Sequence, residues 1–146
     1  MQKQKKPLNL ILLVDDDDTT NFVNTRLLTN MNIAEEIVSV RNGEEALTFL
    51  KEACSETPKP GVACPDLIFL DIKMPVLDGF GFLEQYEEAG LSRLDHIIIM
   101  MLTSSASFYD LEKLKQYKKV KKHLPKALTE ADVRDILNTY FAAQTI

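Results

Sequence analysis

Five polar residues stand at or just beyond the ends of short apolar runs, and their side chains could together do chemistry. In chain order they are Asp15, Asp16, Asp71, Thr103 and Lys126. Fifty-five positions separate Asp16 from Asp71 and also Asp71 from Lys126, so comparable stretches of chain lie between them. A single residue of this kind more often caps a helix and faces water. Five of them at the ends of successive runs indicate a shared site.

The chemistry that fits this set is the transfer of a phosphoryl group to a carboxylate. Three clustered carboxylates repel one another, and a hard divalent cation relieves that repulsion. Magnesium binds one or two carboxylates together with water and phosphate oxygens. Attack of a carboxylate on phosphorus needs positioning and neutralisation of charge more than covalent machinery. A lysine ammonium adds positive charge, and a threonine hydroxyl can donate to a phosphoryl oxygen. The set therefore predicts a magnesium-dependent phosphoaspartate site.

The elements that must position these residues alternate between strands and helices. Short apolar runs predict buried strands at residues 9–14, 37–40, 67–70, 97–102 and 120–124. Helical spacing predicts a first helix that Asp18 or Thr19 caps, and further helices at 44–53, 80–89, 108–118 and 129–142. In the first helix we expect the inward face to hold Phe22, Val23, Leu27 and Met31.

This alternation predicts an α/β fold. Parallel strands need crossover helices, which place helices on both faces of a five-stranded, doubly wound sheet. In such sheets functional groups gather beyond the carboxyl ends of the strands. That rule brings the five polar residues to one edge of the sheet.

Four segments resemble the receiver domains of bacterial two-component response regulators, whose fold is a flavodoxin-like (βα)5 unit. The segments run from Leu12 to Asp16, from Leu70 to Gly79, from Met101 to Ser104, and from Leu124 to Lys126. The resemblance covers about residues 9–143. Asp-x-x-Met-Pro-x-x-Asp-Gly after an apolar strand is specific, whereas the Thr and the Lys alone are weak signals.

The resemblance implies a role for each acid of the site. Asp71 matches the phosphoacceptor. Asp16 matches the direct magnesium ligand, joined by Asp71 and the backbone carbonyl of Lys73. Asp15 matches the acid that holds the ion through water. The implied cofactor is Mg²⁺.

The resemblance also implies switch residues, with departures from the family pattern. Thr103 matches the hydroxyl that moves toward the phosphoryl group, and Lys126 the lysine that pairs with it. The family usually has proline after this lysine, often with a cis bond, whereas Ala127 stands here. A trans bond or an unusual cis bond is expected, since cis non-proline bonds cost about 2.5–4 kcal/mol. His123 stands at the aromatic switch position; it either switches or lies exposed among lysines.

The expected partners are proteins. A histidine kinase, a phosphotransfer protein or a small phosphodonor would supply the phosphoryl group, and a downstream protein would receive the signal. The chain carries a net charge of −5, which disfavours nucleic acid, although residues 113–126 hold seven lysines and no acid. That segment is either a solvated face or a patch for an acidic partner. No apolar run of membrane-spanning length and no signal peptide occur, so a cytoplasmic location is expected.

Residues 1–8 are expected to form a disordered arm, and no output domain is expected beyond residue 143. The chain would then act as a phosphoacceptor, taking part in its own phosphorylation and dephosphorylation, and not as an enzyme. Two alternatives remain: a receiver fold that binds partners without phosphorylation, and a haloacid-dehalogenase-type phosphatase that uses Asp15. Cys54 and Cys64 fall in a loop at 52–65 and are interpreted as free thiols, since a reducing cytosol disfavours a disulfide.

Overall fold

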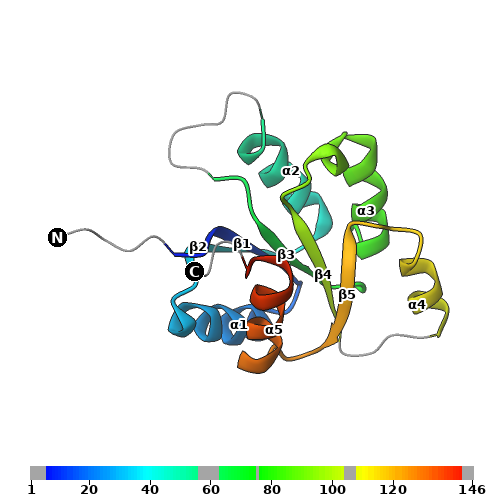
Figure 1. Ribbon diagram of the computed structural model, residues 1–146. Helices are drawn as coiled ribbons and strands as arrows, with labels where there is room; N and C mark the ends of the chain where they lie inside the picture. Colours follow the sequence, from blue (N-terminus) through cyan, green and yellow to red (C-terminus); the bar gives the residue numbers. More distant parts are fainter. Residues whose placement is uncertain (1–5, 56–62, 75, 104–107, 143–146) are drawn as a thin grey trace.

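The computed structural model describes residues 6–55, 63–74, 76–103 and 108–142 (Figure 1). Five strands alternate with five helices. The strands are β1 (Leu8–Val14), β2 (Ala34–Val40), β3 (Leu67–Leu70), β4 (Ile98–Thr103) and β5 (Val120–Pro125). The helices are α1 (Asp18–Met31), α2 (Gly43–Ala53), α3 (Gly79–Glu88), α4 (Phe108–Leu114) and α5 (Glu130–Tyr140), with a 3₁₀ turn η1 at Leu91–Arg93 that the sequence did not predict.

The sheet is parallel, and its strand order is β2-β1-β3-β4-β5. The predicted doubly wound α/β fold is therefore confirmed. The chain leaves β1 toward β2 and leaves β3 toward β5, so the winding reverses between β1 and β3. In open α/β sheets this reversal point is where ligands bind, beyond the carboxyl ends of the strands.

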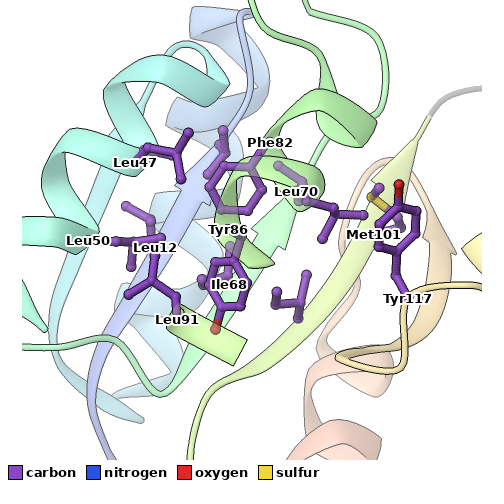
Figure 2. Packing of buried hydrophobic residues seen from close by; sticks show 14 of the residues in the cluster. Leu12, Leu47, Leu50, Ile68, Leu70, Phe82, Tyr86, Leu91, Met101 and Tyr117 are labelled. Atoms are coloured by element: carbon purple, nitrogen blue, oxygen red, sulfur yellow. The ribbon is translucent and has the colours of Figure 1, made fainter. Parts of the chain in front are cut away.

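The sheet separates two hydrophobic clusters. Leu12, Ile68 and Leu70 face α2 and α3, and pack with Leu50 and Phe82 (Figure 2). The alternate residues of the same strands face α1 and α5, where they form the second cluster with Leu28, Val133 and Ile136. Strands covered on both faces are apolar throughout, which explains the uninterrupted apolar runs of β1, β3 and β4.

The arm and the second strand differ from their predictions. Leu8 was expected in a disordered arm at 1–8, but it is fully buried and pairs with Ala34. The backbone N of Lys6 also donates to Glu35 Oε1 at 3.2 Å. Strand β2 thus begins three residues before the predicted 37–40. The first residues of β2 are largely polar because this strand lies at the edge of the sheet, so the apolar pattern did not indicate a strand there. Residues 1–5 lie outside the described part of the chain.

Helix α1 buries only part of the face that was expected: Leu27 and Met31 pack, partly buried, against the second cluster, whereas Phe22 and Val23 do not. Phe22 is 65% exposed and Val23 46% exposed. The buried residues are instead Asn21, Asn24 and Leu28, which are spaced by three and four positions. The prediction that Phe22 and Val23 face inward is wrong, because this helix presents polar side chains to the sheet edge. Helix α4 also ends earlier than the predicted residue 118.

Cys54 and Cys64 form a disulfide, which corrects the interpretation of free thiols. The bond joins the end of α2 to the segment before β3, across ten positions of sequence. The expectation rested on compartment alone, and the spacing of the two residues carried no information about their distance in the fold. Among the described residues no helix is long and apolar enough to span a bilayer.

Candidate functional site

Three carboxylates meet where the winding of the sheet reverses. Asp15 and Asp16 follow β1, and Asp71 follows β3, which pairs directly with β1. One oxygen from each carboxylate lies within 4.8 Å of the others. Asp15 and Asp71 are buried, and Asp16 is half-buried. The backbone fixes this meeting, since Asp71 N donates to the carbonyl oxygen of Val14 at 3.0 Å.

Lys126 reaches the same pocket from the loop after β5. Its Nζ lies 2.8 Å from Asp15 Oδ2 and 3.2 Å from Asp71 Oδ2. The backbone N of Lys126 donates to the carbonyl oxygen of Thr103 at 3.1 Å, which ties the loop to the end of β4. The peptide bond from Lys126 to Ala127 is cis, the second of the two outcomes expected for it. One ammonium thus bridges two carboxylates that come from different strands.

The electrostatics of this pocket oppose full ionisation. Burial, and then the negative charge of Asp15, raise the pKa of the Asp71 carboxyl above its ordinary value, although Lys126 lowers it. Burial alone would lower the pKa of Lys126. The hydrogen bond and charge of Asp15, together with Asp71, outweigh burial and raise that pKa. The pocket therefore holds more negative charge than one lysine compensates.

This donor set fits magnesium. Carboxylate oxygens are the hard ligands that Mg²⁺ prefers, and added positive charge would relieve the repulsion that raises the pKa of Asp71. Asp15, Asp16 and Asp71 would hold the ion. The side chain of Lys73 is exposed, two residues after Asp71; the metal-binding role of its backbone carbonyl stays a prediction.

Thr103 and His123 occupy different surroundings. Thr103 is buried at the end of β4, the strand next to β3. His123 is exposed on β5 and lines a groove of about 400 Å³ with residues of α4 such as Leu111 and Leu114. The structure therefore brings Thr103 to the edge that carries the acids, whereas His123 faces the neighbouring helix. The switch roles of both residues stay predictions.

The comparison that decides the family is with a model of the response regulator receiver domain, which matches residues 11–138. The chain belongs to the response regulator receiver family. The predicted resemblance is thereby confirmed, and the phosphatase alternative is displaced.

Solved and curated relatives agree with this assignment. A two-component response regulator from Cytophaga hutchinsonii superposes with a TM-score of 0.81 at 28% identity, covering 94% of this chain and 99% of that one. The probable transcriptional regulator ycf27 of Pyropia yezoensis is 34% identical over 94% of this chain and 49% of its own length. Response regulator Rcp1 of Synechocystis is 29% identical over 72% of this chain and 68% of its own. This receiver spans about half the length of the first relatives that it matches.

The two further aspartates after β1 are structural in this receiver. Asp17, not Asp18 or Thr19, caps α1: its Oδ1 accepts from Thr19 N at 3.0 Å and its Oδ2 from the Thr20 hydroxyl at 2.9 Å. These bonds, that from Thr20 first, lower the pKa of Asp17. Asp18 pairs with Arg41 at 3.3 Å. The spacing Asp15-x-Asp17-x-Thr19, which resembles the nucleophile motif of the phosphatase alternative, therefore reflects a helix cap.

Two residues that shape the site were not singled out from the sequence. Gly79 lies so close to the end of β3 that a Cβ there would stand 2.6 Å from the carbonyl oxygen of Asp71. The Asp-Gly step of the motif carried this signal: Asp78 caps α3 and Gly79 permits the close approach. Asn21 donates from Nδ2 to the carbonyl oxygen of Asp15 at 2.8 Å. The sequence offered one signal for this residue. Asn21 lies seven residues, about two helical turns, before the buried Leu28, so both fall on the same face of α1.

Proposed function

We propose that this receiver accepts a phosphoryl group on Asp71 in a Mg²⁺-dependent reaction and relays a signal through a conformational change. The observation that carries the proposal is the bridge from Lys126 to Asp15 and Asp71 beside a third carboxylate. We further propose that residues 9–143 act as one receiver domain. It is a phosphoacceptor that takes part in its own phosphorylation and dephosphorylation, and it is not an enzyme acting on other substrates.

The residues divide the chemistry among them. An Oδ of Asp71 attacks phosphorus and forms the new O–P bond. The bond from phosphorus to the donor, P–N in a phosphohistidine or P–O in an acyl phosphate, breaks and leaves its electron pair on the donor. When bound, Mg²⁺ supplies positive charge next to the phosphoryl oxygens. Lys126 adds charge from the other side, and the hydroxyl of Thr103 donates to a phosphoryl oxygen.

Burial contributes to this reaction. Asp71 is 5% exposed, so water competes poorly as a donor of hydrogen bonds to its carboxylate. Its raised pKa reflects the energetic cost of a buried charge, which partner cations reduce. We infer that the incoming phosphoryl group shares Lys126 with Asp71, and that this change in the partners of Lys126 starts the signal.

The groove between α4 and β5 is the proposed output surface. Its lining combines apolar side chains, Leu111, Leu114 and Val120, with three lysines and one acid: Lys115, Lys121, Lys122 and Glu112. Thr103 lies on β4, which pairs with β5 beside this groove. Movement of Thr103 toward the phosphoryl group, followed by His123, would shift the groove between two packings. The partner there is a downstream protein, or the phosphoryl group passes onward to a phosphotransfer protein.

Intact-mass spectrometry after incubation with acetyl phosphate tests the chemistry. We expect the mass of one phosphoryl group to appear with magnesium and not without it, and Asp71→Asn to lose it. Asp66→Asn is a matched control, because Asp66 is a buried acid at the opposite end of β3, where its Oδ2 accepts from Asn9 N at 2.7 Å. An adduct that survives Asp71→Asn would refute the proposal. No adduct on the wild-type protein would favour an interaction module that is not phosphorylated.

Amide NMR spectra with and without a phosphoryl mimic test the output. We expect shifts at Thr103 and along β5, including His123, and smaller shifts on the far side of the sheet at Ile136 of α5. Shifts confined to the acidic pocket would show that the α4–β5 groove is not coupled to it.

A further inference from the structure

A buried asparagine of α1 contacts the backbone of the acidic pocket. Asn21 is 6% exposed, and its Nδ2 donates to the carbonyl oxygen of Asp15 at 2.8 Å. The backbone N of Asn21 bonds to the carbonyl oxygen of Asp17 at 3.1 Å. The side chain is therefore held beneath the loop that joins β1 to α1, the loop that carries two of the three acids.

The accepting carbonyl belongs to the peptide that joins the two acids. The carbonyl of Asp15 and the N–H of Asp16 lie in one plane, so the direction of that carbonyl sets where the Asp16 side chain leaves the backbone. The hydrogen bonds of the sheet do not by themselves fix the orientation of the Asp15–Asp16 peptide. Asp15 N donates to Val40 O at 3.1 Å, and Asp15 Oδ1 accepts from Asp17 N at 2.9 Å. Asn21 supplies the contact to the carbonyl side.

Packing does not explain an asparagine at this position. The Oδ1 of Asn21 is buried and has no hydrogen-bond partner among the described residues. A leucine of the same branching would fill the space without burying an unpaired oxygen. It would, however, leave the Asp15 carbonyl without the amide donor. The asparagine thus holds the peptide while one buried oxygen of its own stays unpaired.

We propose that Asn21 is a positioning residue that orients the Asp15–Asp16 peptide so that both carboxylates can bind magnesium. This inference rests on the proposed function. Residues behind the direct ligands of a metal orient those ligands, and their loss weakens metal binding by about 10- to 100-fold. Asn21 acts on the backbone of two acids at once, through one hydrogen bond.

The neighbouring Asn24 gives a matched control. It lies on the same buried face of α1, is 2% exposed, and also has an unpaired Oδ1. Within the described ranges no hydrogen bond joins its side chain to Asp15 or Asp16. The substitutions Asn21→Leu and Asn24→Leu therefore remove the same atoms from the same helix face, and only the first removes a contact with the pocket.

The experiment titrates the 146-residue chain and each variant with MgCl₂ alone and follows the amide NMR signals of the pocket, with thermal unfolding measured in parallel. We expect Asn21→Leu to bind magnesium at least about tenfold more weakly than wild type. Its thermal midpoint should stay within a few degrees of wild type, because removal of the unpaired Oδ1 offsets loss of the donor to the Asp15 carbonyl. Asn24→Leu should bind magnesium as wild type does.

Equal magnesium affinity in Asn21→Leu and wild type would overturn the inference while leaving the proposed function intact. An equal loss in Asn24→Leu would overturn it too, because the effect would then belong to the helix face in general. A wild-type protein that binds no magnesium would instead overturn the proposed function, and the inference with it.

Discussion

Removing the positive charge of Lys126 should destabilise this receiver at neutral pH and much less in acid. The ammonium lies 2.8 Å from Asp15 Oδ2 and 3.2 Å from Asp71 Oδ2. At an effective dielectric constant of about 20, each pair gains about 5–6 kcal/mol of Coulomb attraction, and desolvation offsets most of it. Loss of one partner from a buried pair costs about 3–5 kcal/mol. Because the Lys126 side chain stays 16% exposed, we expect Lys126→Met to cost about 3 kcal/mol.

The sign of the pH dependence follows from the pKa directions. Lys126 has a raised pKa, so its contribution is present at neutral pH and is lost as pH rises through that pKa, above 10.5. Asp71 also has a raised pKa: its protonated form stabilises the fold below about pH 3.8, and this contribution is lost as pH rises through the raised value. Acidification protonates Asp71, one of the two carboxylates that Lys126 contacts. The difference in the free energy of unfolding between wild type and Lys126→Met should therefore be largest at pH 7 and should shrink as Asp71 becomes protonated.

Thermal unfolding followed by circular dichroism measures this difference. For a chain of this size about 3 kcal/mol corresponds to a midpoint lower by about 10 °C. Added MgCl₂ should recover more stability in Lys126→Met than in wild type, because the ion replaces the missing charge.

The control for this measurement is Lys122→Met on β5, the strand that precedes Lys126. Lys122 pairs with Asp135 at 3.4 Å, and its side chain is 50% exposed, so its loss should cost less than about 1 kcal/mol. The reasoning is refuted if Lys126→Met is no less stable than Lys122→Met at pH 7. It is also refuted if the stability that Lys126→Met loses is as large in acid as at pH 7.

Three other perturbations address the close packing, the caps and the titration of the site. Gly79→Ala should cost about 1–3 kcal/mol in chemical denaturation, because the new Cβ would stand 2.6 Å from the backbone oxygen of Asp71. Gly81→Ala should cost less, since its Cβ would meet the movable end of Leu77; equal costs would contradict this account. Asn42→Ala should cost about 1 kcal/mol by removing the cap of α2, and an unchanged denaturation midpoint would argue against that role. Phosphorylation of Asp71 by acetyl phosphate should slow as pH falls through a range above 3.8, because the raised pKa leaves the nucleophile protonated there; a rate independent of pH down to pH 4 would count against it.

The sequence was informative wherever burial is uniform. The runs that became β1, β3 and β4 are covered on both faces, so their apolar residues are continuous and the acids that follow them mark the strand ends. The meeting of Asp15, Asp16 and Asp71 followed from that pattern and from parallel pairing. Edge strand β2 has one poorly covered side, so its first residues looked like loop.

Where a helix covers the polar edge of the sheet, apolar periodicity was misleading. The apolar spacing of Phe22 and Val23 predicted the inward face of α1, yet the buried positions hold Asn21 and Asn24. Asn21 is buried because its side chain donates a hydrogen bond to the carbonyl oxygen of Asp15. A search for apolar periodicity cannot detect a buried position of this kind. The pairing of Cys54 with Cys64 was missed for a related reason, since distance across a loop is set by the fold and not by spacing.

The division of the interior by the sheet has a consequence for how this receiver tolerates substitution. Leu50 belongs to the cluster under α2 and α3, whereas Ile136 belongs to the cluster under α5, and the sheet stands between the two clusters. Residues that share no contacts usually change stability independently, so losses from the two sides should add. Repacking under α5 can therefore proceed without disturbing the packing under α2 and α3. The two faces of the molecule can diverge separately around a fixed row of strand-end acids.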